Sequence, residues 1–363
     1  MNTDKKYMSL AIELAKKAEG RTSPNPLVGA VIVKRGKIVG KGYHKKCGLP
    51  HAEMNAIKAA GDAAGGSTLY VTMEPCDHYG RTPPCTDAII KSGIKRVVIA
   101  MKDPNPITDG RGIKKLKAHK INTKVGVLEK EARAINRPFI KFITKKLPFV
   151  RVKVAESIDG KIATKSGDSK WISGEASRRY VHGLRSRVDA VMVGSGTVLK
   201  DDPMLLCRIP GAKQPLRIIA DSSLKMPFTS KLFSTAGSHS VLIATTKKAP
   251  FKKAEVYARN GISLLFCKIK NNRIDLKDLL KKLSWLGVTD LLVEGGGELV
   301  AGLVEKKLVD QFIFFISPKI IGGRDAKTAV EGTGVDKVAD AVKLKNISIR
   351  MFEDDVMIEA EAA

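Results

Sequence analysis

Three potential zinc ligands lie far apart in the chain, and they restrict how it folds. His51 and Glu53 are two positions apart, whereas Cys76 and Cys85 are separated by the loop 77–84. A zinc ion binds imidazole nitrogen and cysteine sulfur at distances of about 2.0–2.3 Å. If these residues hold one ion, the fold must bring the region of position 51 and both ends of the cysteine loop to a single point.

The same residues indicate a catalytic zinc site. Three protein ligands leave the fourth tetrahedral position open for water, which becomes a usable nucleophile near neutral pH. Glu53 is suited to take the proton of that water and deliver it to a leaving amine. Side chains two positions apart on a helix point about 200° apart, so His51 and Glu53 can share a site only in a first turn, where Pro50 places them. A structural site needs a fourth ligand, which His78 or Cys47 could supply.

Length and composition predict two globular domains in a reducing compartment. The 363 residues, 43% of them hydrophobic, suffice for two ordinary domains. The sequence has no apolar run of roughly 18 residues, so no membrane span is expected. It also lacks a secretory leader at its start, and five cysteines do not suggest a disulfide framework. We therefore expect a cytoplasmic protein in which two cysteines are metal ligands.

The formal net charge of +27 restricts the function less than its size suggests. It is compatible with attraction of an anionic substrate, cofactor or nucleic acid. It is also compatible with a solvated surface rich in lysine, which the scattered lysine pairs favour. Charge alone does not distinguish RNA from a phosphorylated metabolite.

Apolar spacing and turn residues predict strands alternating with helices, typical of an α/β fold with a largely parallel or mixed sheet. In the first part we expect helices at 7–18, 51–60, 84–92 and 112–119, and strands at 28–33, 37–43, 68–72, 96–101 and 122–127. In the second we expect strands at 149–155, 190–193, 216–220, 241–245, 263–266, 290–293 and 311–316, and helices at 174–187, 275–286 and after the glycines at 295–297. A junction near 144–148 separates a domain at 1–146 from one at 147–363.

Longer motifs make the interpretation specific. The first part contains Ser-Pro-Asn-Pro-Leu-Val-Gly at 23–29 and Asp-Pro-Asn-Pro at 103–106. The second contains Lys-Val-Ala-Glu-Ser-Ile-Asp-Gly-Lys-Ile-Ala at 153–163, Ser-Lys-Trp-Ile-Ser at 169–173, Gly-Ser-Gly-Thr-Val at 194–198, Asp-Asp-Pro at 201–203 and Val-Glu-Gly-Gly at 293–296. The long cysteine loop departs from the Cys-x-x-Cys of other base deaminases. Together these motifs resemble the bifunctional riboflavin-biosynthesis deaminase/reductase family over nearly the whole chain.

The resemblance implies two domains and two reactions. A cytidine-deaminase-like three-layer domain at 1–146 would bind one Zn²⁺, and a dihydrofolate-reductase-like α/β domain at 147–363 would bind NADPH. The first domain would hydrolytically remove the 2-amino group of a diaminopyrimidinone that carries a ribosylamino 5′-phosphate. The second would reduce the ribosyl group of the resulting aminouracil to a ribityl chain.

The resemblance also implies which deaminase residues contact substrate. Asn25 would hold the pyrimidine, because an amide offers both a donor and an acceptor to a base edge. His78 and Arg81 would face the substrate from the cysteine loop, with Arg81 suited to phosphate. Asp103 and Asn105 either border the same pocket or form a plain turn, which Asp-Pro-Asn-Pro also favours.

In the reductase part the resemblance implies three groups of residues. Lys153 and Asp201 are candidates for handling the ring-opened sugar and its proton. The expected substrate contacts are Ser169, Arg185, Leu205, Arg208 and Glu294. The expected cofactor contacts are Ala155, Trp171, Thr197, Asp201, Ser222, Gly295, Gly296 and Gly297. Trp171 could instead fill the core, and Gly-x-Gly-x-x-Gly is absent, so a standard dinucleotide-binding fold is not expected.

Two other functions remain open at this stage. One is an RNA-editing deaminase with an accessory domain, favoured by the charge and disfavoured by the cysteine spacing and the reductase motifs. The other is a non-catalytic scaffold with a relict zinc. We expect small-molecule substrates rather than nucleic acid or membrane, and a homo-oligomer. The strand at 312–316 is either an interface or core.

Overall fold

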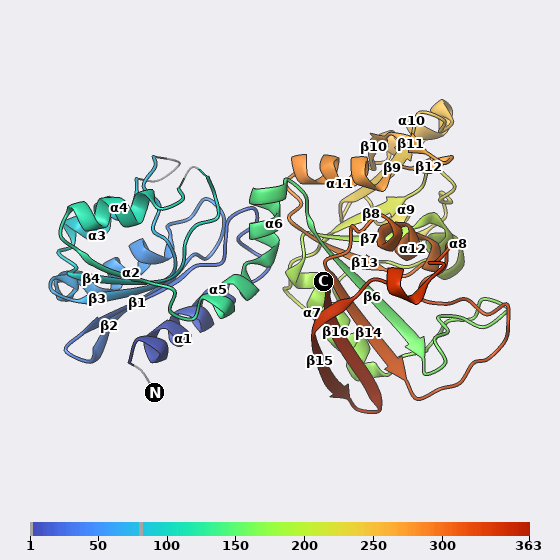
Figure 1. The fold of residues 1–363 in the computed structure, drawn as a ribbon. Helices are drawn as coiled ribbons and strands as arrows, with labels where there is room; N and C mark the ends of the chain where they lie inside the picture. The colour runs from blue at the N-terminus through green and yellow to red at the C-terminus, as the bar shows by residue number, and fades with distance from the viewer. Residues whose placement is uncertain (1–2, 80–82, 107) are drawn as a thin grey trace. The chain divides into compact units, whose positions relative to one another are not determined.

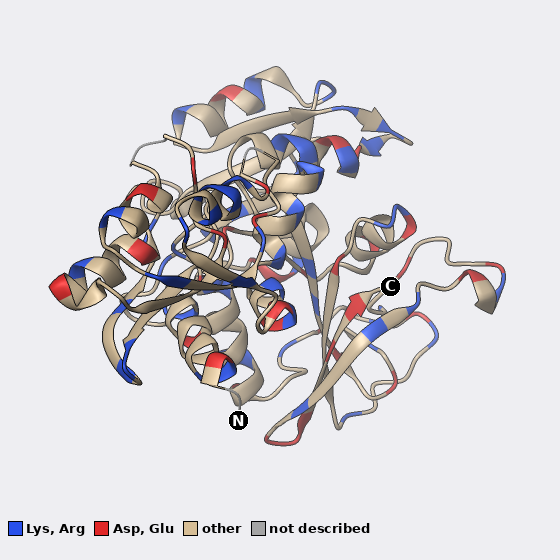
Figure 2. Ribbon diagram, turned by 60° about the vertical axis from the view of Figure 1, so that its left-hand side comes forward, with Lys and Arg blue, Asp and Glu red and all other residues tan. Residues whose placement is uncertain are grey.

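The computed structural model describes residues 3–79, 83–106 and 108–363. The chain divides into two compact units, Met1–Lys146 and Leu147–Ala363, called unit 1 and unit 2 below. Each contains its own sheet and its own hydrophobic core. Lys and Arg residues are distributed over the helices, strands and loops of both units (Figure 2).

Unit 1 is built on a mixed five-stranded sheet in the order β2-β1-β3-β4-β5 (Figure 1). Its strands are β1 (Gly29–Lys34), β2 (Lys37–Tyr43), β3 (Thr68–Met73), β4 (Arg96–Met101) and β5 (Asn122–Val125). Strand β1 pairs antiparallel with β2 and β3, while β4 is parallel to both β3 and β5. The carboxyl ends of β3 and β4 therefore lie at one edge, directly before the cysteine loop and Asp103.

Helices cover both faces of this sheet. They are α1 (Thr3–Lys16), α2 (Ala52–Ala60), α3 (Cys85–Lys91), α4 (Arg111–Ala118), α5 (Glu129–Ile135) and α6 (Arg137–Lys145), with a 3₁₀ turn, η1, at Gly61–Ala64. Side chains of α1, α5 and α6 pack with Val31 and Val98 on one face. Those of α2, α3 and α4 pack with Ile32 and Val97 on the other. Alternate residues of one strand thus serve opposite layers, the expected three-layer arrangement.

Helix α2 lies unusually close to strand β2. A Cβ atom at Gly42 would lie 2.3 Å from the carbonyl oxygen of Ala52, and one at Gly40 would lie 2.3 Å from that of Ala56. No side chain fits at either position, so glycine lets the helix backbone rest on the strand. This contact fixes the first turn of α2, which carries Glu53.

Unit 2 contains a nine-stranded mixed sheet in the order β10-β9-β8-β7-β13-β6-β14-β16-β15. The strands are β6 (Phe149–Ser157), β7 (Ala190–Gly194), β8 (Leu216–Ala220), β9 (Val241–Thr246), β10 (Ser263–Cys267), β13 (Asp290–Glu294), β14 (Gln311–Ser317), β15 (Leu344–Phe352) and β16 (Asp355–Ala362), and a small hairpin holds β11 (Ile269–Lys270) and β12 (Arg273–Ile274). The strands from β10 to β14 pair in parallel, and β16 and β15 add antiparallel.

Both faces of this sheet are also covered. The helices are α7 (Glu175–Arg187), α8 (Ser195–Asp201), α9 (Lys231–Ser234), α10 (Phe251–Arg259), α11 (Leu276–Trp285) and α12 (Gly297–Glu305), with η2 at Val338–Asp340. Leucines of α11 and α12 cover one face, while α7, α8, α9 and α10 cover the other. A parallel sheet buried on both faces collects side chains at the carboxyl ends of its strands.

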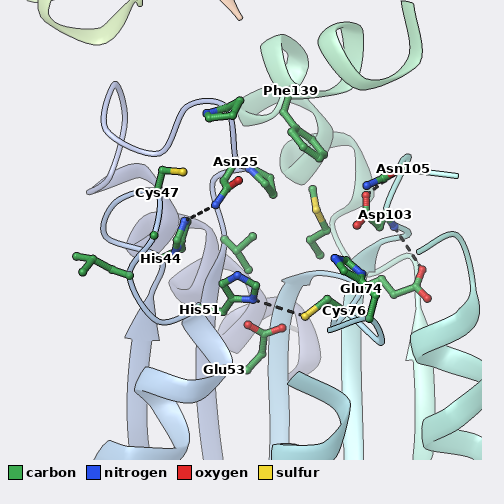
Figure 3. A pocket seen from close by; sticks show the side chains of 17 residues that line it. Asn25, His44, Cys47, His51, Glu53, Glu74, Cys76, Asp103, Asn105 and Phe139 are labelled. Carbon is green, nitrogen blue, oxygen red and sulfur yellow. Dashed lines mark hydrogen bonds between the residues drawn. The ribbon is translucent and has the colours of Figure 1, made fainter. Parts of the chain in front are cut away.

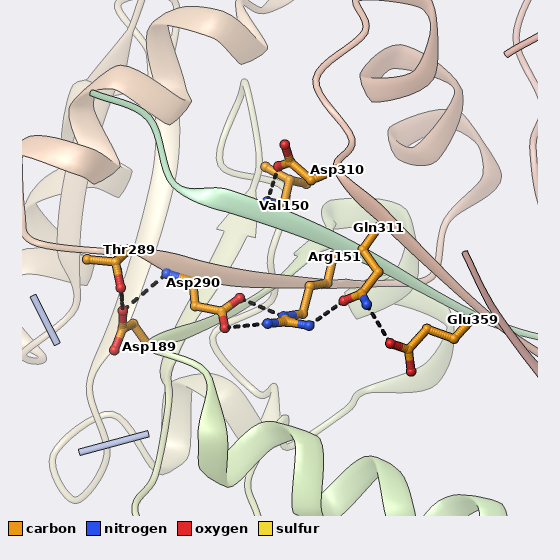
Figure 4. Close-up of polar contacts among 8 residues, drawn as sticks. All are labelled: Val150, Arg151, Asp189, Thr289, Asp290, Asp310, Gln311 and Glu359. Carbon is orange, nitrogen blue, oxygen red and sulfur yellow. Dashed lines mark hydrogen bonds and ion pairs between the residues drawn. The ribbon is translucent and has the colours of Figure 1, made fainter. Parts of the chain in front are cut away.

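A polar network joins four neighbouring strands of this sheet, β13, β6, β14 and β16 (Figure 4). Arg151 on β6 forms two bonds with Asp290 on β13, of 2.8 and 3.0 Å, and also donates to Gln311 on β14. Gln311 in turn donates to Glu359 on β16 at 2.6 Å. Because each partly buried polar group has a partner, the network fixes the strand alignment without leaving an uncompensated charge.

The predicted strands and helices are present, with ends that differ by a few residues. The motif Gly-Ser-Gly-Thr-Val at 194–198 leads from the end of β7 into helix α8, which was not among the expected helices. Phe312, Ile313 and Phe315 are buried in the middle of the sheet, so the strand at 312–316 is core. Among the described residues, no helix is both long and apolar enough to cross a membrane.

Candidate active sites

A cavity of about 460 Å³ opens at the carboxyl edge of the unit 1 sheet (Figure 3). Its size suits a small-molecule ligand. Seven of the residues predicted for the deaminase line it: Asn25, His51, Glu53, Cys76, His78, Asp103 and Asn105. Arg81 lies outside the described residues.

The three expected metal ligands form one cluster: His51 and Cys76 line this cavity, and the buried Cys85 lies next to them. Their ligand atoms all lie within 4.8 Å of one another. His51 Nδ1 is 3.2 Å from the sulfur of Cys85 and 3.6 Å from that of Cys76. Tetrahedral ligands at ordinary zinc distances are about 3.6 Å apart, so the spacing fits zinc. Within the described part of the chain, neither His78 nor Cys47 joins this group as a fourth ligand.

Local structure explains how the ligands converge. His51 is the residue before α2, with an extended backbone, and Glu53 lies in the first turn. Cys76 follows the end of β3, and Cys85 is the first residue of α3. The backbone N–H of Cys85 donates to the sulfur of Cys76 at 3.4 Å, which draws the two ends of the loop together.

Burial and neighbouring charges adjust the protonation of this cluster. The side chain of Glu53 is buried, which, together with the nearby Cys76 thiolate, raises its pKa to about 7. Hydrogen bonds from Cys85 and His51 lower the pKa of Cys76 to about 4. Glu53 can therefore both accept and release a proton near neutral pH, as a general acid and base must.

Asn25 is held in place by a histidine that the sequence did not single out. His44 is buried, and its Nε2 lies 3.2 Å from the amide nitrogen of Asn25. Its Nδ1 lies 3.3 Å from the carbonyl oxygen of Pro50. Burial lowers the pKa of His44, so a neutral ring that donates to Pro50 and accepts from Asn25 fits both contacts. The amide oxygen of Asn25 remains available to a ligand.

Asp103 and Asn105 combine a turn with a place in the cavity wall. The backbone N–H of Asn105 donates to the carboxylate of Asp103 at 2.9 Å, a typical Asx turn. Burial raises the pKa of Asp103. Both side chains line the cavity, so the two interpretations of this motif are compatible.

In unit 2, three of the predicted residues form one charged cluster. Glu294 is opposite Lys153 in the pairing of β13 with β6. Arg185 of α7 binds both carboxylate oxygens of Glu294, at 2.6 and 2.8 Å. Burial lowers the pKa of Lys153. Burial alone would raise the pKa of Glu294, but Arg185 brings it below its usual value.

Two further contacts lie among the predicted reductase residues. Ser169 donates to the carboxylate of Asp201 at 3.2 Å. Gly295 and Gly296 have φ angles of 75° and 82°, and a Cβ at Gly296 would lie 3.3 Å from the hydroxyl of Thr197. The turn before α12 therefore presents bare backbone beside Thr197, which suits an anionic group such as a pyrophosphate.

The remaining predicted residues of unit 2 differ in how exposed they are. Leu205 is buried in the core, so only its backbone could meet a ligand, whereas Arg208 is exposed. Trp171 is 61% exposed and therefore does not fill the core; its ring stacks on Arg178, 4.7 Å away. Ala155 lies on β6, and Ser222 follows β8.

Comparisons with known proteins agree on one family. Residues 148–358 match the RibD C-terminal domain, and residues 1–101 match the cytidine and deoxycytidylate deaminase zinc-binding region. Riboflavin biosynthesis protein RibD of Aquifex aeolicus is 46% identical over 98% of this chain and 97% of its own length. RibD of Actinobacillus pleuropneumoniae is 45% identical over 98% and 95%.

The chain belongs to the RibD family.

Solved RibD structures share the whole fold. A deaminase/reductase of Thermotoga maritima, described as diaminohydroxyphosphoribosylaminopyrimidine deaminase/5-amino-6-(5-phosphoribosylamino)uracil reductase, superposes with a TM-score of 0.88 at 38% identity, covering 99% of both chains. RibD of Acinetobacter baumannii gives a TM-score of 0.90 at 36% identity, with the same coverage. The predicted fold class, a cytidine-deaminase-like domain followed by a reductase domain, is confirmed.

The predicted activity is confirmed in the same way. Like other RibD proteins, this chain is a bifunctional deaminase and reductase of riboflavin biosynthesis. Zn²⁺ and NADPH are its two cofactors. The RNA-editing and scaffold interpretations fall with this result, because the family match extends through both halves of the chain.

Several side chains at the RibD sites carried no signal in the sequence. His44, Glu74 and Phe139 line the unit 1 cavity. In unit 2, Nδ1 of His182 accepts from the backbone N–H of Arg208 at 3.3 Å. A single histidine or phenylalanine has no motif of its own. A contact search around Asn25 and Arg185 would be needed to find these residues.

Proposed function

We propose that unit 1 removes the 2-amino group of 2,5-diamino-6-ribosylamino-4(3H)-pyrimidinone 5′-phosphate and that unit 2 reduces the product, 5-amino-6-(5-phosphoribosylamino)uracil. The Thermotoga maritima relative carries both activities in its description. The observation that carries the proposal is the cluster of His51, Cys76 and Cys85 at a cavity that the buried carboxylate of Glu53 also lines. A hydrolytic deaminase requires this combination.

In the deaminase reaction, His51, Cys76 and Cys85 hold the zinc ion. When bound there, Zn²⁺ would act as a Lewis acid and make water nucleophilic near neutral pH. Glu53 accepts the proton from the attacking water and delivers it to the leaving amine, a role that its raised pKa of about 7 supports. Asn25, fixed by His44, binds the edge of the pyrimidine.

The rest of the substrate is bound around the rim of the same cavity. His78, Asp103 and Asn105 line the cavity wall and can hydrogen-bond to the ring and the ribose. Arg81 binds the 5′-phosphate in this proposal, since guanidinium groups pair well with phosphate. These assignments distribute recognition over the loops that follow β3 and β4.

In the reductase reaction, Lys153 and Asp201 handle the ring-opened sugar and its proton. Bound NADPH supplies the hydride. The lowered pKa of Lys153 supports proton transfer, because a lysine with an ordinary pKa holds its proton too tightly. Substrate contacts come from Ser169, Arg185, Leu205, Arg208 and Glu294, with the backbone of Leu205 replacing its buried side chain.

NADPH binding is assigned to the loops at the carboxyl ends of β6, β7, β8 and β13. The bare turn Gly295–Gly297, next to Thr197, supports the pyrophosphate. The exposed ring of Trp171 offers a flat apolar surface. The other cofactor contacts in this proposal are Ala155, Asp201 and Ser222.

The test is a crossover of two variants. Glu53→Gln should reduce ammonia release by about 10²-fold or more while NADPH oxidation with pre-deaminated substrate continues. Asp201→Asn should damage the reductase while deamination continues. Ammonia is measured by a coupled assay, and NADPH by absorbance. Equal loss of both activities in either variant contradicts separate sites.

We also propose that the protein is a homodimer paired through β15, the edge strand of the unit 2 sheet. On this strand Ile347, Ile349 and Met351 are 61%, 65% and 62% exposed. An unpaired edge carrying alternating apolar side chains invites a further strand. A second copy of β15, related by a twofold axis, would pair with the backbone groups of this edge through the same residues in both copies.

Sedimentation velocity tests the dimer. Ile349→Lys should convert the protein to a monomer, because a buried lysine at the paired edge is costly. Phe251→Lys, an equally apolar and exposed residue on α10, should leave the mass unchanged. A dimer that survives Ile349→Lys would place the interface elsewhere.

A reducing compartment such as the cytoplasm suits this chain. Its five cysteines are free thiols, and Cys76 and Cys85 can hold zinc only when reduced. Cell fractionation with an antibody to the protein checks this assignment.

A further inference from the structure

The two ends of the cysteine loop are tied together by side chains that are not zinc ligands. The hydroxyl of Thr86, next to Cys85, donates to the carboxylate of Asp77, next to Cys76, at 2.8 Å. The backbone N–H of Thr86 also donates to the carbonyl oxygen of Cys76 at 3.2 Å. The residue after Cys76 and the residue after Cys85 are therefore in direct contact.

Lys115 of α4 strengthens this junction. Its ammonium group lies 2.7 Å from the carboxylate of Asp77 and 2.6 Å from that of Asp87. One cation thus bridges the residue after Cys76 and the third residue of α3. Without it, Asp77 and Asp87 would leave two negative charges at the same place, and like charges repel.

Helix α4 is itself anchored to the strand end that carries Cys76. The carboxylate of Glu74 accepts the backbone N–H groups of Gly110 at 3.0 Å and Ile113 at 3.2 Å. A Cβ at Gly112 would lie 2.0 Å from the carbonyl oxygen of Pro75, so only glycine permits this approach. Lys115 therefore projects from a helix whose distance from the loop is fixed.

We propose that α4 holds the two ends of the cysteine loop together and that Lys115 is a positioning residue for the zinc site. By holding Asp77 and Asp87 together, Lys115 keeps the sulfurs of Cys76 and Cys85 at the spacing that zinc requires. This inference rests on the proposed zinc-binding role of His51, Cys76 and Cys85. Residues that orient metal ligands commonly affect metal affinity by 10- to 100-fold.

The experiment measures zinc release from the full-length holoenzyme into excess chromogenic chelator. Lys115→Met keeps the length of the side chain and removes the charge, and it should release zinc about tenfold faster than wild type. Lys115→Arg can still bridge two carboxylates and should largely restore the slow rate. Lys117→Met, exposed on the same helix, is the control and should match wild type.

A spectroscopic readout separates positioning from general destabilisation. In the Co²⁺-substituted protein, Lys115→Met should shift the visible bands that report tetrahedral thiolate coordination, while reductase activity stays at the wild-type level. If Lys115→Met fails to accumulate, Asp87→Asn provides the same comparison. Zinc release at the wild-type rate, with unchanged Co²⁺ bands, would contradict the positioning role of Lys115. Wild-type protein without zinc would instead refute the proposed metal site itself.

Discussion

Glu294 and Arg185 make a paired contact that depends on the shape of the guanidinium group. Two parallel bonds of 2.6 and 2.8 Å join them, and both groups are largely buried. Arg185 also donates to the carbonyl oxygen of Leu206 at 3.0 Å, which connects the pair to the loop of Leu205 and Arg208. The pair thus links α7, β13 and this loop at one point.

Arg185→Lys should therefore weaken the reductase even though the charge is kept. A lysine offers a point charge and cannot form both bonds with Glu294. Loss of one charge-assisted bond, worth about 1.5–3 kcal/mol, corresponds to roughly a 10- to 100-fold increase in KM for the reductase substrate. Steady-state NADPH oxidation measures it. Arg179→Lys, exposed on the same helix, should change little, and an unaltered KM in Arg185→Lys would remove Arg185 from the substrate site.

Among single residues, the sequence indicated those whose side-chain type suits a particular reaction. It missed those whose role depends on partners that only folding brings near. The sequence indicated His51, Cys76 and Cys85 because zinc binds imidazole and thiolate groups, and Glu53 because deamination needs a carboxylate that carries a proton; the structure brings the three possible ligands together. Glu74 was not, because its function comes from three backbone N–H groups brought to it by folding. Burial of Leu205 likewise depends on packing between elements.

Among the secondary-structure elements, helix α1 is fastened to the sheet by one carboxylate. Asp4 accepts bonds from Arg96 on β4 at 2.8 and 2.9 Å, from Lys124 on β5 at 2.9 Å and from Tyr70 on β3 at 3.1 Å. The hydrogen bonds from Arg96 outweigh burial, so the pKa of Asp4 falls far below its usual value of 3.8. The charged form of Asp4 therefore stabilises the folded state.

Asp4→Asn should lower the free energy of unfolding by about 2 kcal/mol near pH 7. Because the pKa of Asp4 is lower in the folded state than its ordinary value of 3.8, the stabilisation is present at pH values above 3.8. It is lost as the pH falls below that value towards the folded-state pKa. The difference between wild type and variant should shrink over this range in urea unfolding followed by circular dichroism. Glu13→Gln, exposed on the same helix, is the control. A difference independent of pH would show that Asp4 acts by packing alone.

Elements with a clear hydrophobic period were predictable, whereas those with conflicting local signals were not. Helix α6 contains Phe139, Ile140, Phe142 and Ile143, residues that favour strands, yet it forms a helix in which the partly buried Phe139 and Ile140 pack against the unit 1 core. Helix α8 was not expected, and it contains Gly196, a residue that disfavours helices. The hairpin of β15 and β16 at the sheet edge was not predicted.

For the whole molecule, zinc and NADPH are proposed to bind to different units. Removal of zinc with a chelator should abolish ammonia release and leave NADPH oxidation with pre-deaminated substrate intact, since the proposed zinc ligands all lie in unit 1. Added Zn²⁺ should restore the lost activity. The two activities are measured on the same dialysed sample. A parallel fall of both rates would show that unit 2 depends on the metal.

The division into two α/β units was also predictable, because alternating strands and helices occur on both sides of the junction near 146. The order of strands within each sheet was not. Strand β13 lies between β7 and β6, which are far from it in sequence. Such pairing depends on long-range packing that local patterns do not contain.

The close contact between α2 and β2 has a consequence for how natural and laboratory variation in this chain is interpreted. Gly40 and Gly42 take no part in chemistry, yet any replacement drives a methyl group into a helix carbonyl. In a saturation screen for riboflavin-independent growth, both positions should tolerate glycine alone, as strictly as a zinc ligand does. Intolerance to substitution near His51 will therefore reflect steric fit as well as reactivity.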